Sequence, residues 1–96
     1  MTNFSDMLSK AKDMQKKMKE VQEQIKKIEV TGMSGGNLVK VILTGDYEIK
    51  SIEISDAAEK ESQEIINDLI IAAYNNAKEN LKKKSAEELS KVTGGL

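Results

Sequence analysis

Apolar residues in the first part of the chain recur every seven positions, which is the spacing of a coiled-coil helix. The flanking positions Gln15 and Gln22 are polar, so the apolar seam is narrow. This pattern predicts a helix over residues 1–27. It lies either on its own domain's core or against another helix, and the narrow seam favours the second arrangement. Two series offset by three positions form the seam: Phe4, Ala11, Met18 and Ile25, and Met7, Met14, Val21 and Ile28.

After residue 28 the apolar period changes from seven to two, which indicates β-strands. Three strand-like runs follow, "IEVTGM" (28–33), "LVKVIL" (38–43) and "YEIKSIEI" (47–54), separated by the turns "SGGN" and "TGD". Short glycine-containing turns between such runs predict a three-stranded antiparallel meander. In the third run Tyr47 and Ile49 alternate in one phase and Ile52 and Ile54 in the other, which predicts a bulge near residues 50 and 51.

A second helix is expected from about residue 60 to about residue 83, because residues 65–77 carry a broad apolar surface. Beyond Ala77 the sequence turns polar, and Ser85 and Glu88 have the spacing of a further capping box. The fold class is therefore α+β, in the order α-β-β-β-α. We expect one domain over residues 1–96, made of a projecting helix (1–27), an antiparallel sheet (28–54) and a second helix with its tail (55–96).

The two expected helices are longer than the sheet. A 24-residue helix spans roughly 36 Å, whereas a strand of six to eight residues spans roughly 20–26 Å. The first helix approaches the sheet and the second leaves it. The start of the first helix and the end of the second are therefore expected to overhang the core.

The middle strand-like run is apolar on both faces. Val39, Val41 and Leu43 point to one side, and Leu38 and Ile42 point to the other. An antiparallel sheet in a small monomer usually has one face in water. We therefore expect the chain's own helices to cover one face and a second copy to cover the other. This predicts a homodimer with an interface at Leu38, Val39, Val41 and Ile42.

The chain carries 15 lysines, no arginine and 16 acids, and this charge is unevenly distributed. Residues 1–27 hold seven lysines and four acids, and residues 28–96 hold eight lysines and twelve acids. The lysines gather where the helices overhang, and they suit the phosphates of duplex DNA. Three aromatic residues offer no stacking platform for single strands. A plain solvated face stays open as the alternative. The candidate contacts are Lys10, Lys12, Lys16, Lys17, Lys19, Lys82, Lys83 and Lys84.

Other classes of function find little support in the composition. The chain has no cysteine and no histidine, so it lacks thiolates, the commonest general base and the commonest metal ligand. We expect no enzyme activity, no metal, no cofactor and no small-molecule substrate. The longest apolar run, "LIIAAY" (69–74), is far shorter than a membrane span. No secretory signal is visible, and we expect a cytoplasmic protein that does not bind membranes.

The order and spacing of several segments resemble a known family. They are "SGGNLVKV", "TGDYEIKSIEIS", "LIIAAYNNA" and the terminal "TGG", preceded by a helix rich in methionine and lysine. Together they are similar to the YbaB/EbfC family of small bacterial nucleoid-associated proteins over nearly the whole chain. The resemblance implies an α-β-β-β-α fold and a homodimer whose helices project like the arms of a tweezer. It also implies binding to duplex DNA in the nucleoid, with roles in nucleoid organisation and gene regulation.

A prefoldin-like coiled-coil scaffold or holdase chaperone is the alternative reading. Helices that flank β-hairpins and carry a heptad seam are typical of that architecture. It requires heptads on both helices, however, and here the second helix loses its apolar stripe after Ala77. The alternative therefore fits the sequence less well than a DNA-binding protein.

Overall fold

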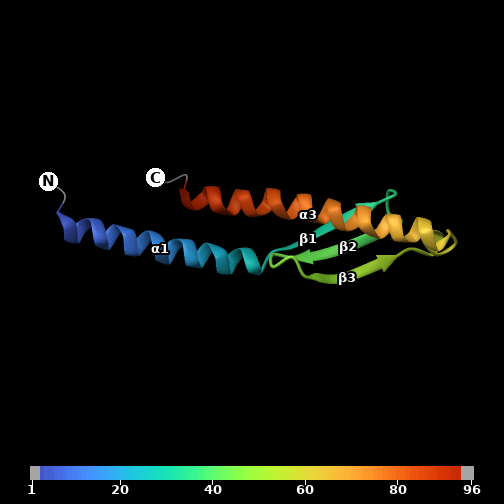
Figure 1. Ribbon diagram of the computed structural model, residues 1–96, viewed down its shortest axis with the longest axis horizontal. Coiled ribbons are helices and arrows are strands. Elements are labelled where there is room, and N and C mark those ends of the chain that lie inside the picture. Colours follow the sequence, from blue (N-terminus) through green and yellow to red (C-terminus); the bar gives the residue numbers. More distant parts are fainter. Residues whose placement is uncertain (1–2, 94–96) are drawn as a thin grey trace.

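The computed structural model describes residues 3–93 and has the expected order of helix, three strands and long helix (Figure 1). The molecule is elongated, measuring 70 × 18 × 16 Å. A short helix, absent from the expectation, precedes the last long one. The elements are α1 (Phe4–Lys26), β1 (Glu29–Ser34), β2 (Val39–Thr44), β3 (Ile49–Ile54), α2 (Asp56–Glu59) and α3 (Gln63–Thr93).

Helix α1 has a capped N-terminus and projects beyond the sheet. The Asn3 side chain accepts a hydrogen bond of 2.8 Å from the Asp6 backbone N–H, which satisfies one of the unpaired donors of the first turn. The burial of the seam rises along the helix: Met7 is exposed, Met14 is half-buried and Val21 is buried. The expected overhang at the start of α1 is therefore confirmed.

The sheet is an antiparallel meander in the order β1-β2-β3. Val41 lies opposite Ile52 and Leu43 lies opposite Ile49, so β3 carries one extra residue between these pairs. The predicted bulge is confirmed. Its effect is to bring Ile49 and Ile52, which alternate out of phase in the sequence, to the same face of the sheet.

Helix α3 covers that face over β1 and β2 (Figure 1). Val39, Val41 and Leu43 are fully buried under it, together with Ala73 and Ala77 of α3 and others of the core. The approach is close because Gly32 of β1 has no side chain: a Cβ there would overlap backbone atoms of Ala73 and Ala77. The core is thus a thin layer between one helix and two strands.

Helix α3 is longer than the expected 60–83, since it runs without a break to Thr93. Residues 56–59 form the separate helix α2, which the Ser55 side chain caps. Ser85 and Glu88, expected to start a further helical segment, lie inside α3. The polar residues after Ala77 are mostly Lys and Glu, which favour helix, and α3 also contacts α1. The final residues 94–96 lie outside the described part of the chain.

Candidate nucleic-acid interface

The eight candidate lysines all lie on one end of the molecule. Beyond the sheet, α1 and the last part of α3 run side by side in opposite directions (Figure 1). Leu81 is the last buried residue of α3 within the part of the chain whose side chains are described. We call α1 together with residues 82–93 the arm. The structure places all eight lysines on it, and each is exposed: Lys10, Lys12, Lys16, Lys17, Lys19, Lys82, Lys83 and Lys84.

None of these eight lysines forms an ion pair within the described residues. Other lysines do: Lys40 pairs with Glu53 at 3.6 Å, and Lys50 pairs with Glu29 at 2.5 Å, both on the sheet. On the arm itself, Lys91 pairs with Glu88 at 3.0 Å. The cations of the sheet are therefore largely neutralised by neighbouring carboxylates, whereas the candidate lysines keep their charge available for an external anion.

The charges of α1 are arranged around its apolar stripe. The helix turns about 100° per residue. Lys10 precedes Ala11 by one residue and Lys12 follows it, so the two lysines flank the stripe on either side. Lys17 and Lys19 flank Met18 in the same way. The sequence carries this signal as the segments "KAK" (10–12) and "KMK" (17–19), seven residues apart.

The acids of α1 lie mostly on its back. Asp6, Asp13 and Glu20 each follow a residue of the series Phe4, Ala11 and Met18 by two positions, which is about 200° around the helix. They therefore project away from the apolar stripe. Lysines flank that stripe, and three of the four acids of α1 lie on the opposite side of the helix.

A shallow hollow of about 430 Å³ lies against the positive side of α1. It is lined by Lys12, Gln15, Lys16 and Lys19. Three lysines and one glutamine line it, and no acidic residue is among the lining residues. Such a surface attracts phosphate oxygens and holds them without a fixed geometry, because each lysine is a point charge on a flexible stem.

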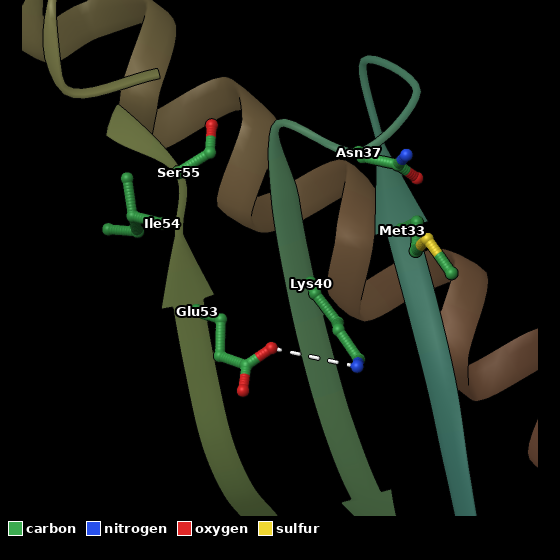
Figure 2. A pocket seen from close by; sticks show the side chains of 6 residues that line it. All are labelled: Met33, Asn37, Lys40, Glu53, Ile54 and Ser55. Carbon is green, nitrogen blue, oxygen red and sulfur yellow. Dashed lines mark ion pairs between the residues drawn. The ribbon is translucent and has the colours of Figure 1, made fainter. Parts of the chain in front are cut away.

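A second hollow, of about 330 Å³, lies on the sheet face away from α3 (Figure 2). Its lining residues are Met33, Asn37, Lys40, Glu53, Ile54 and Ser55. Its one lysine, Lys40, reaches across to Glu53 of the neighbouring strand. This hollow therefore offers no free cation, and it is a poorer site for an anion than the arm.

The part of the chain that the structure describes shows neither a metal-ligating cluster nor a membrane-spanning helix. Within residues 3–93 there is no group of three or more His, Cys, Asp or Glu side chains that could hold a metal ion. None of the helices in that range is long and apolar enough to cross a membrane.

Two of the four residues predicted for the dimer interface are misplaced. Val39 and Val41 are fully buried beneath α3 of the same chain, so a second copy cannot contact them while the helix is in place. Helix α3 covers the face of β2 that carries these valines. Leu38, just before β2, is half-buried and packs against the same core, and Ile42, on the other face of β2, is half-buried as well.

Sequence reasoning missed an exposed apolar surface beside α3. Ile49 and Ile52 face the same side as Val41 and Leu43, but α3 lies mainly on β1 and β2, and these isoleucines are 47% and 43% exposed. Ile71 of α3 is exposed as well. The phase shift in β3 was the signal for this surface, since the bulge turns both isoleucines to one face.

The two edges of the sheet differ. At β1, the Asn76 side chain accepts from the Met33 N–H at 3.0 Å, and the Asn80 side chain donates to the Thr31 carbonyl at 2.9 Å. Helix α3 thus satisfies part of the β1 edge. Strand β3 pairs only with β2 within the described chain, so its outer edge is open.

Known proteins resemble this chain in sequence and in fold. The chain matches the YbaB/EbfC DNA-binding family over residues 1–96. Among curated relatives, a nucleoid-associated protein of Rhodospirillum centenum is 40% identical and covers 100% of this chain and 91% of its own. One from Hahella chejuensis is 35% identical, over 98% of this chain and 87% of its own. A solved structure of an uncharacterized protein from Helicobacter pylori shares the fold, with a TM-score of 0.73, 22% identity and coverage of 91% and 92%.

Proposed function

This chain belongs to the YbaB/EbfC DNA-binding family, and on that premise we propose that it is a nucleoid-associated protein that binds duplex DNA with low sequence specificity. The observation that carries the proposal is the group of eight exposed arm lysines, none of them in an ion pair within residues 3–93. The net charge of the chain is −1, so close contact with DNA has to be made by local positive charge. The arm holds that charge away from the acidic remainder.

Low specificity follows from the chemistry of the cations. All fifteen are lysines, and lysine lacks the rigid fork with which arginine reads guanine. Contacts to phosphate position a protein on the duplex but carry no sequence information directly. We infer that many sites along the chromosome are occupied, so that the protein locates to the nucleoid and affects its organisation and the expression of genes within it.

Duplex DNA is a better ligand than a single strand. Single-strand binding requires aromatic side chains on which bases stack. Of the three aromatics, Tyr74 is half-buried against the core and Tyr47 sits in the turn before β3, while Phe4 alone lies on the arm. They do not form a platform.

We further propose that the protein acts as a homodimer formed through β3 and the adjoining surface of α3. The exposed isoleucines Ile49 and Ile52 and the open β3 edge lie together, whereas asparagines of α3 bond to the β1 edge. This surface replaces the buried Val39 and Val41 of the sequence-based prediction. Dimerisation would present two arms to one duplex.

The DNA-binding proposal is tested by gel shift or fluorescence anisotropy with a short duplex across a salt series. If each protomer neutralises about two to three phosphates, a dimer makes about four to six contacts, and log affinity falls against log salt with a slope of roughly −4 to −5. Non-specific affinity is expected near 10⁻⁴–10⁻⁶ M at physiological salt.

The decisive variant replaces the four lysines Lys10, Lys12, Lys16 and Lys17 with glutamine, which should flatten the slope. The matched control replaces Lys40 and Lys50, which are ion-paired on the sheet, and should change the slope little. Equal binding by the quadruple variant and the wild type at every salt concentration would show that the arm lysines are only a solvated face.

The dimer proposal is tested by sedimentation equilibrium at micromolar concentration. Ile52→Asp should convert a dimer to a folded monomer, because Ile52 is 43% exposed in one chain and supports little of its core. Met33→Asp, at an exposed site on the opposite sheet face, is the control and should stay dimeric. A monomer mass for the wild type would refute the proposal.

A further inference from the structure

The first two turns of α1 carry a group of large apolar side chains in the open. Phe4 is 74% exposed, Met7 59% and Leu8 46%. They are neighbours on one side of the helix, since they are three and four residues apart. We call these three residues the apolar tip. Further along the same seam Val21 is buried, so the packing that covers the seam near the sheet does not extend to the tip.

The apolar tip lies on the positive side of α1. The next residue of its stripe is Ala11, which Lys10 and Lys12 flank on either side. Asp6 and Asp13 project from the opposite side of the helix, about 200° around from Phe4 and Ala11 respectively. A ligand that covers the tip therefore meets two lysines and avoids the nearest acids. A ligand complementary to this surface has negative charges that face the lysines and apolar surface between those charges.

A second copy of the tip is a poor match for this surface. Residues 1–27 carry seven lysines and four acids, so two tips brought together would repel each other. Stacked base pairs between two phosphate strands have the required chemistry, because apolar faces lie inside and negative charge lies on both flanks. The charge pattern therefore favours duplex DNA as the occupant.

We propose that the apolar tip acts as a wedge that enters a base step from the minor groove and bends the duplex. The inference rests on the proposed DNA binding and adds a distortion to it. Phenylalanine, leucine and methionine are residues that architectural proteins insert between base pairs, which unstacks the step and kinks the DNA by roughly 20–90°. Here Phe4 is the leading wedge, and Lys10 and Lys12 hold phosphates on the two sides of the step. Pyrimidine–purine steps, which kink easily, are the favoured sites.

The test measures binding and bending on the same complexes. A duplex of about three helical turns, labelled at both ends, reports bending by energy transfer, and 2-aminopurine beside a central TA step reports unstacking. Salt-series gel shifts on the same duplex report binding. Wild type should shorten the end-to-end distance and raise the 2-aminopurine signal. Phe4→Ala should lose most of both effects with an unchanged salt slope, and Phe4→Leu should retain them. Met33→Ala, an exposed apolar site on the sheet, is the control and should bend DNA as wild type does.

Several outcomes would overturn the wedge. One is a bend of wild-type size with Phe4→Ala, and another is binding by the wild type without bending. A fall in the sedimentation mass of Phe4→Ala without DNA would instead assign the tip to contacts between copies of the chain. If the wild type fails to shift the duplex at any salt concentration, the proposed function fails too, and the gel shift shows this separately from the bending signal.

Discussion

Replacing Gly32 by alanine tests how α3 is seated on the sheet. Gly32 lies opposite Val41 on the inner face of β1, where the backbone of α3 passes directly over it. A Cβ at this position would overlap backbone atoms of Ala73 and Ala77, with the Cα of Ala77 only 2.6 Å away. Because the atoms in the way belong to backbone, no side-chain rotation relieves the clash, and the helix itself has to move.

The cost follows from that movement. Carbon atoms pack at about 3.5–4.0 Å, so α3 has to lift from β1 by about 1 Å. Inserting a methyl group into a packed core costs about 1–3 kcal/mol. Alanine in place of glycine returns about 0.5–1 kcal/mol through the lower entropy of the unfolded chain. Lifting the helix also loosens its contacts with Val39 and Leu43, so we expect a net loss of about 2 kcal/mol.

Urea denaturation followed by circular dichroism measures this loss as a lower midpoint at an unchanged m-value. Thr31→Ala serves as the control, because the neighbouring residue on β1 points its side chain to the other face. If Gly32→Ala unfolds within about 0.5 kcal/mol of wild type, the range of a neutral surface change, then α3 does not rest on Gly32 and the described packing is wrong.

Two further substitutions examine the arm and the β1 edge. Met7→Ala should change stability by less than about 0.5 kcal/mol, whereas Leu81→Ala, fully buried where α3 leaves the core, should cost about 2–5 kcal/mol; equal costs in chemical denaturation would mean that α1 is packed along its whole length. Asn76→Ala should speed hydrogen exchange of the Met33 amide, which donates to the Asn76 side chain, while the stability falls by only about 0.5–1.5 kcal/mol. Unchanged protection of that amide in nuclear magnetic resonance would contradict the described hydrogen bond.

Much of the fold could be predicted from periodicity, because the signals involved are local. The heptad repeat places α1, alternation with glycine turns places the three strands, and the phase shift at residues 49–52 places the bulge. The overhang of α1 follows from element lengths alone, and the exposure of Phe4 and Met7 confirms it. The C-terminal end of α3 was harder to predict, because its apolar stripe thins beyond Ala77. Contact with α1 also stabilises this part of the helix, and the sequence of α3 alone does not show that contact.

The charge on the arm is a property of the sequence, while its availability is a property of the structure. Composition and position identify the lysine-rich overhangs and the absence of arginine. For the lysines of the sheet, ion pairing depends on neighbours that are distant in the chain. Lys50 meets Glu29 across the sheet, 21 residues away, and Lys40 meets Glu53 on the adjacent strand. Only strand register brings these pairs together.

Tertiary structure alone decided how closely α3 packs against the buried face of the sheet. The alternation within β2 already indicates which face is buried, since Val39, Val41 and Leu43 lie on one side and Lys40, Ile42 and Thr44 lie on the other. The close approach depends on Gly32, whose bare backbone lies on the same face as Val41 and admits the small side chains Ala73 and Ala77 at close range. A helix packs most closely on a strand where the facing residues of both elements have small side chains or none. This complementarity joins residues more than 40 positions apart, and it exists only once the strands are paired.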